Sequence, residues 1–132
     1  MLQKIDHLGL VVGDLEAAIA RWRDVLGLEV THREVVEDQG VEVAKLPVGT
    51  SAVELIRPIA EGTGVAKFLE KRGEGIHHVC FVVADLEGAL ARLAEAGVRL
   101  IDAKPRRGAG GDLVAFVHPS ATNGLLVELK QG

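Results

Sequence analysis

The chain has 132 residues, a formal net charge of -4, and 48% hydrophobic residues. This length and composition predict one globular domain with a full core, and the acidic balance excludes a basic surface for nucleic acid. Because the chain shows neither an apolar stretch of roughly 20 residues nor a secretory leader pattern, we expect a cytoplasmic protein without membrane contact.

The first half of the chain predicts a strand, a helix and three further strands. Residues 5–12 form the first strand pattern, and Asp14 follows as a natural helix N-cap. Apolar residues at helical spacing run from Leu15 to Leu26, where Gly27 supplies the stop. Strand patterns at 29–36, 41–48 and 51–58 complete a βαβββ order.

The second half repeats this order after a short linking helix at about 62–74. Asp85 caps a helix that ends at Gly97, and strand patterns follow at 98–101, 112–118 and 123–130. We therefore predict an α+β fold in one domain over 1–132. Module one spans about 1–60 and module two about 75–132, and together they form a curled mixed sheet with the helices outside.

The two halves also share a repeated sequence. Residues 5–15 read IDHLGLVVGDL and residues 76–86 read IHHVCFVVADL, which places His7 over His78, 71 positions later. AVEL at 52–55 matches LVEL at 126–129, which places Glu54 over Glu128, 74 positions later. The three extra positions (74 minus 71) belong in a loop.

Strand alternation places all four of these residues on the face away from the helices. Their apolar neighbours, such as Leu10 and Leu129, fall on the opposite face, and so does His77. A single histidine or glutamate is more often structural, but here the repeat predicts the four residues in pairs. Two nitrogen and two oxygen ligands suit Co, Mn, Ni, Zn or Fe better than Ca.

Cys80 is the only cysteine, so no intrachain disulfide can form. A lone cysteine within an apolar strand is more often part of the core than a nucleophile.

These motifs are similar to those of the vicinal oxygen chelate (glyoxalase) superfamily and, within it, of the methylmalonyl-CoA epimerase family. The resemblance covers almost the whole chain. It rests on IDHLGLVV at 5–12, RDVLGLEV at 23–30, EDQGV at 37–41, VELIRP at 53–58, KFLEKRGEGIHHVCF at 67–81, PRRGAGG at 105–111, FVHP at 116–119 and GLLVEL at 124–129.

The resemblance implies an isomerase that interconverts (2R)- and (2S)-methylmalonyl-CoA, an acyl-CoA thioester, through a metal-stabilised enolate. It implies one divalent metal ion per chain (Co, Mn, Ni or Zn) and Glu128 as the first base. The implied metal ligands are His7, Glu54, His78 and Glu128. A homodimer is expected because exposed strand edges of such modules commonly pair.

The second base and the CoA contacts stay open. Some family members carry a glutamate where this chain has Val43, and Glu42 replaces it only if a β-bulge changes the register. A metal-bound water is a competing proton carrier. The basic residues Lys104, Arg106 and Arg107 form either a flap that binds the substrate or an ordinary solvated loop.

Three other functions remain as alternatives. A lactoylglutathione lyase (glyoxalase I) type isomerase uses a similar metal site. An extradiol dioxygenase uses two histidines and one carboxylate, against which Glu54 argues. A metal-free small-molecule-binding protein on the same fold tends to lose ligands that this chain keeps.

Overall fold

The computed structural model describes residues 1–132, which divide into two compact units. The N-terminal unit comprises His7–His77, and the C-terminal unit comprises Met1–Asp6 together with His78–Gly132. The division passes through strands β1 (Leu2–Val11) and β5 (Gly75–Val83), so each of these strands contributes residues to both units. The single domain expected from the sequence stays a prediction.

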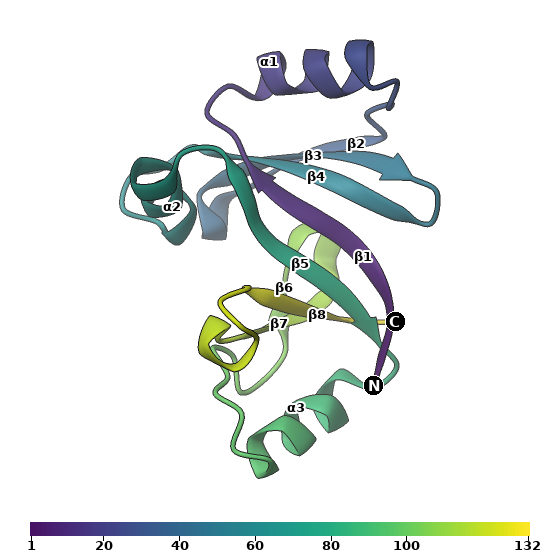
Figure 1. Ribbon diagram of the computed structural model, residues 1–132, viewed down its shortest axis with the longest axis vertical. Helices are drawn as coiled ribbons and strands as arrows, with labels where there is room; N and C mark the ends of the chain where they lie inside the picture. The colour runs from purple at the N-terminus through teal and green to yellow at the C-terminus, as the bar shows by residue number, and fades with distance from the viewer. The chain divides into compact units, whose positions relative to one another are not determined.

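The N-terminal unit has its strands in the order β2-β3-β4-β1. Strand β3 pairs antiparallel with β2 and with β4, whereas β4 pairs parallel with β1. Helix α1 lies on one side of these strands (Figure 1). In chain order after β1, the elements are α1 (Leu15–Ala20), a π-helical turn (Arg21–Val25), β2 (His32–Val36), a 3-10 turn (Glu37–Gln39), β3 (Val41–Val48), β4 (Ser51–Pro58) and α2 (Gly64–Arg72).

The C-terminal unit has its strands in the order β1-β5-β8-β7-β6. Strands β5 and β8 are parallel, and β7 is antiparallel to both β8 and β6. After β5 come α3 (Leu86–Glu95), β6 (Arg106–Arg107), a 3-10 turn (Ala109–Gly111), β7 (Leu113–Val117), a second 3-10 turn (Pro119–Ala121) and β8 (Val127–Gln131). The predicted α+β class, the tandem βαβββ order and the mixed pairing are confirmed.

Each unit packs one helix on its strands through the apolar stripe that the sequence indicates. Asp14 and Asp85 act as the predicted N-caps, since their side chains accept hydrogen bonds from the backbone N–H groups of Ala17 and Gly88. A fully buried leucine contributes about 1.5–3 kcal/mol. The α1 core contains Val12, Leu15, Ala18, Ile19, Ala44, Leu46, Val53 and Leu55, and the α3 core contains Val83, Leu86, Ala89, Leu90, Ala115, Val117, Val127 and Leu129.

The end of the first helix differs from the prediction. After Ala20 the chain widens into the π-helical turn, in which the Leu26 N–H donates to the Arg21 carbonyl five residues back at 3.3 Å. A wider turn rotates the following residues away from a stripe that has the α-helical period. Val25, assigned to the core by its spacing, is therefore 76% exposed.

The strand predicted at 98–101 is also wrong. Only Leu100 forms a bridge there, opposite Val117, and the regular strand of this region is β6 at Arg106–Arg107. The apolar run at 98–101 instead covers the α3 core, against which Val98 and Leu100 pack. A short apolar run indicates burial, but it does not determine strand pairing.

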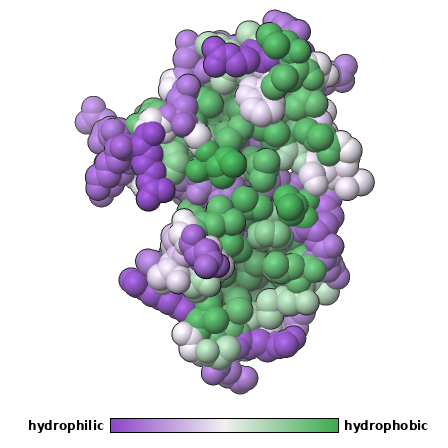
Figure 2. Space-filling model, viewed as in Figure 1, coloured by the Kyte–Doolittle hydropathy of each residue, from purple (hydrophilic) through white to green (hydrophobic).

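Hydrophilic residues gather over helix α2 on the face drawn in Figure 2. Lys67, Glu70, Lys71 and Arg72 are all exposed on this helix. None of the helices has the length and apolar character needed to cross a lipid bilayer.

Candidate active site

In the N-terminal unit, the buried His7 on β1 and the largely buried Glu54 on β4 form a pair. The parallel register places Gly9 opposite Glu54, so the residue facing the carboxylate carries no side chain. His7 Nδ1 lies 2.8 Å from Glu54 Oε2, and His7 is only 7% exposed. Their strand neighbours Leu10 and Leu55 belong to the α1 core on the opposite face, as alternation predicts.

In the C-terminal unit, His78 on β5 and Glu128 on β8 form the matching pair. His78 Nε2 lies 3.2 Å from Glu128 Oε1, and both residues are under 9% exposed. Phe116 of β7 presents its ring edge-on to the imidazole of His78 at 5.7 Å between centroids. The strand neighbours Val127 and Leu129 pack on the opposite face with α3.

Both pairs fit the ligand set predicted for a divalent metal ion. Imidazole nitrogens and carboxylate oxygens are the donors that first-row divalent metals bind. Carboxylates are rarely buried unless they are paired or bind a metal, because desolvation disfavours the charge. Each unit therefore supplies one buried nitrogen donor, together with an oxygen donor that is buried at Glu128 and largely buried at Glu54.

His77 lies apart from the metal-ligand face, as predicted. Its ring packs at 5.2 Å against Phe68 of α2, at an interplanar angle of 75°. Arg72 covers the same phenylalanine, with its guanidinium carbon 5.6 Å from the ring centroid. The second histidine of the HH motif thus has a packing role between β5 and α2.

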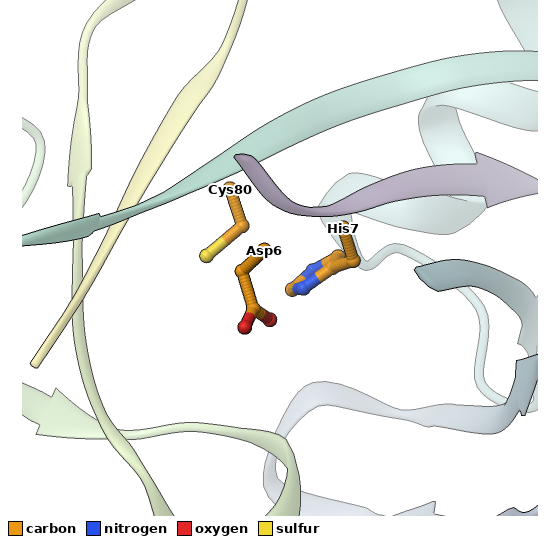
Figure 3. Close-up of side chains that lie close together, drawn as sticks. All are labelled: Asp6, His7 and Cys80. Atoms are coloured by element: carbon orange, nitrogen blue, oxygen red, sulfur yellow. The ribbon is translucent and has the colours of Figure 1, made fainter. Parts of the chain in front are cut away.

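Asp6 and Lys130 are charged residues near the candidate site that sequence reasoning missed. Figure 3 shows Asp6 of β1 and Cys80 of β5 with side chains pointing to the same side, and the ligand atoms of the two lie within 4.8 Å. Lys130 Nζ lies 3.3 Å from Asp6 Oδ1 and 3.3 Å from Asp112 Oδ2. Burial disfavours the ammonium, but the two carboxylates outweigh it and raise the pKa of Lys130.

The signal for Lys130 was present in the sequence, because it follows Glu128 by two residues on the same strand. Asp6 had no such signal, since strict alternation would place it on the side of Leu8. Cys80 is completely buried in β5, in agreement with a packing role.

No β-bulge brings Glu42 to the face of Val43. Strand β3 pairs without a bulge from Val41 to Val48, and Glu42 stands opposite Arg57. Its carboxylate accepts from Arg57 Nη2 at 3.1 Å and from Arg33 Nη2 at 3.2 Å, and these hydrogen bonds hold its pKa below the ordinary value. Arg33 in turn pairs with Glu16 of α1, so this network lies on the helix side.

Val43 occupies the other face of β3. It is buried with Val41 and Ile56, and the side chains of Val36 and Val65 pack against them. The position where some family members carry a glutamate is therefore an apolar cluster in this chain.

The three basic residues of the predicted flap do not act as one cluster. Lys104 is exposed. Arg106 lies over the ring of Phe116 with its guanidinium carbon 5.1 Å from the centroid, whereas Arg107 donates to the Gly111 carbonyl at 2.7 Å.

A cleft of about 380 Å³ lies on the helix side of the N-terminal unit. Two of its three charged residues have structural partners, since Asp14 caps α1 and Glu74 accepts from the Gly13 N–H at 2.8 Å, and the third is Arg21. The cleft is lined by Trp22 and Leu10, which also border the α1 core.

Comparison with known proteins identifies the family. Residues 6–116 match the family model of the Glyoxalase/Bleomycin resistance protein/Dioxygenase superfamily. An ethylmalonyl-CoA/methylmalonyl-CoA epimerase of Cereibacter sphaeroides is 43% identical over 99% of both chains. A solved structure of a methylmalonyl-CoA epimerase in complex with methylmalonyl-CoA and NH4+ has 39% identity and a TM-score of 0.95, over 100% of this chain and 96% of the other. A variant of the Streptomyces coelicolor enzyme in complex with 2-nitronate-propionyl-CoA has the same identity, coverage and TM-score.

The fold is thus that of the glyoxalase superfamily, and the chain belongs to this superfamily. Within this superfamily the full-length similarity is to epimerases, which are isomerases. The chain belongs to the methylmalonyl-CoA epimerase family.

Proposed function

We propose that this chain epimerises methylmalonyl-CoA by removing the α-proton from one face of the carbon and returning a proton to the other. The observation that carries the proposal is that two His–Glu pairs lie at repeat-related positions of the chain. The chain also resembles epimerases over its whole length. The acyl-CoA substrate is supported by the complexes of similar enzymes with methylmalonyl-CoA and 2-nitronate-propionyl-CoA.

We further propose that His7, Glu54, His78 and Glu128 hold one divalent metal ion, for which Co, Mn, Ni and Zn suit the donor set. When bound, such an ion supplies Lewis-acid stabilisation of the enolate, worth several kcal/mol. The support is that each unit pairs a buried histidine with a glutamate whose side chain is at most 12% exposed, and that Glu54 and Glu128 occupy equivalent strand positions.

Glu128 is the proposed first base. A general base must lie within hydrogen-bond reach of the proton that it removes, and its carboxylate takes up that proton as the enolate forms. Glu128 is 8% exposed, and its Oε1 lies 3.2 Å from His78 Nε2. The second proton transfer requires another group, and we do not propose Glu42 for it because two arginines bind its carboxylate on the helix side.

The test is incubation of the purified protein with a single epimer of methylmalonyl-CoA in heavy water, with Co²⁺ or with EDTA. We expect deuterium at the α-carbon and a mixture of epimers with Co²⁺, and neither with EDTA. Absence of exchange with every metal would reject the epimerase and direct the assay to the hemithioacetal of glutathione. The homodimer and the cytoplasmic location stay predictions.

A further inference from the structure

Two adjacent arginines on the short strand β6 have different surroundings. Arg106 stands opposite Val114, and Arg107 stands opposite Leu113. Leu113 packs with the α3 core, so Arg107 shares the helix side. Because alternate residues of β7 share a face, Arg106 lies on the side of Val114 and Phe116.

Arg106 is held in place by an acidic partner. Asp102 Oδ2 accepts from Arg106 Nε at 3.3 Å and from the backbone N–H of Phe116 at 2.8 Å. The flat face of the guanidinium covers the Phe116 ring at 5.1 Å from its centroid. These contacts use Nε and the plane of the group, and the two terminal amino groups take no part in them.

Phe116 connects this guanidinium to the proposed metal ligands of the same unit. It stands opposite Glu128 in the β7–β8 register and contacts the His78 imidazole edge-on. Arg106 is therefore separated from His78 by one aromatic ring. Its side chain is 45% exposed, so a ligand can reach the group from solvent.

We propose that Arg106 binds the free carboxylate of the acyl group and so selects 2-carboxyacyl thioesters over simple acyl thioesters. The inference rests on the proposed function, in which the reacting carbon lies between a thioester and a carboxylate. A guanidinium matches a carboxylate with two parallel hydrogen bonds and stays charged at every working pH.

The phosphates of CoA are the other oxyanions on the same substrate. They are separated from the thioester by the pantetheine arm, whereas the carboxylate is attached to the reacting carbon. A group one ring away from His78 is therefore assigned to the carboxylate.

The test measures the affinity of the Co²⁺-loaded protein for three ligands, with wild type, Arg106→Gln and Arg106→Lys. Methylmalonyl-CoA has both oxyanions, propionyl-CoA has only the phosphates, and methylmalonyl-pantetheine has only the carboxylate. We expect Arg106→Gln to lower the affinity for both methylmalonyl thioesters by about 10- to 100-fold, the range for a charged hydrogen bond. The affinity for propionyl-CoA should change by less than about twofold. Arg106→Lys keeps the cation without the planar fork, so its loss should be intermediate.

Two arginine variants serve as comparisons. Arg92→Gln removes the same charge from the exposed surface of α3 and should leave all three affinities unchanged. Arg107→Gln should lower these affinities by less than about threefold, because the Arg107 guanidinium is bound to the Gly111 carbonyl. An equal loss in Arg107→Gln would show that only the net charge of the segment matters, which would overturn the proposal.

The remaining outcomes are also decisive. Equal losses for propionyl-CoA and methylmalonyl-CoA would assign Arg106 to the CoA phosphates and overturn the proposal, as would no loss for any ligand. If wild type epimerises methylmalonyl-CoA while Arg106→Gln binds normally, only this inference fails. If wild type neither binds nor epimerises it, the proposed function fails as well.

Discussion

His7 Nδ1 lies 2.8 Å from Glu54 Oε2, across the parallel pairing of β1 and β4. In such a contact the imidazole and the carboxylate each compensate the free-energy cost of withdrawing the other from water. If the pair is a half of a metal site, removal of the imidazoles should abolish metal binding without unfolding the helix-side cores.

The first prediction therefore concerns the variant with both His7→Ala and His78→Ala. We expect it to lose stoichiometric Co²⁺ binding, measured by titration calorimetry, because carboxylates alone are poor ligands for this metal. The matched control removes the exposed His32 and the half-buried His118 with His32→Ala and His118→Ala and should bind Co²⁺ as wild type does. Full metal occupancy in the first variant would contradict the site assignment.

The second prediction separates the two glutamates. Glu128→Gln should lower α-proton exchange by about 100-fold or more, since general acid–base catalysis typically contributes 10²–10⁴-fold. Glu54→Gln keeps an oxygen ligand and should retain most of the exchange once saturated with metal. Deuterium uptake in heavy water measures both, and equal losses would argue against a separate role for Glu128 as the base.

The third prediction concerns Glu42. Because its carboxylate is bound by Arg57 and Arg33, Glu42→Gln should leave the exchange rate within about twofold and lower the free energy of unfolding by roughly 0.2–1 kcal/mol. A loss of exchange comparable with that of Glu128→Gln would restore Glu42 as a catalytic group.

The fourth prediction is the pH dependence of that stability difference. Hydrogen bonds from Arg57 and Arg33 lower the pKa of Glu42 in the folded protein from its ordinary value of 4.5. A carboxyl group with a lowered folded pKa stabilises the protein fully above its unfolded pKa, and this contribution disappears as the pH falls through the folded pKa. Urea unfolding of wild type and Glu42→Gln should therefore differ at pH 7 and converge in acid.

The fifth prediction tests the helix-side core. Leu55 is completely buried between α1 and the sheet, so Leu55→Ala should lower the free energy of unfolding by about 2–5 kcal/mol. Leu129→Ala, at the matching position of the second module, should cost a similar amount. Val25→Ala should change stability by less than about 0.5 kcal/mol, because the π-helical turn leaves Val25 exposed. A large loss there would mean that this side chain is buried in solution.

Much of the fold was predictable because the sequence contains two copies of the same βαβββ pattern. The repeated IDHLGLVV-type strand, the aspartate caps and the glycine stops are local signals, and two consistent copies reduce the ambiguity of each. Strand alternation also predicted correctly that Glu54 and Glu128 lie opposite the helix cores. Their joint binding of one metal ion stays a prediction.

Other features depend on contacts that a sequence pattern does not encode. The bridge at Leu100 and the strand at Arg106–Arg107 both depend on pairing with residues of β7. The Asp6 carboxylate pairs with Lys130, 124 residues later, which strand alternation does not predict. The different surroundings of Arg106 and Arg107 follow from a two-residue strand, which is too short to recognise from its composition.

The outermost strands of both units carry charged side chains. Strand β2 ends the order of the N-terminal unit with His32, Arg33 and Glu34, and β6 ends that of the C-terminal unit with two arginines. Exposed strand edges can pair with other chains and start aggregation, and short, charged edges oppose this. Arg106, which borders the proposed substrate site, therefore also helps to protect a newly folded chain from uncontrolled extension of its sheet.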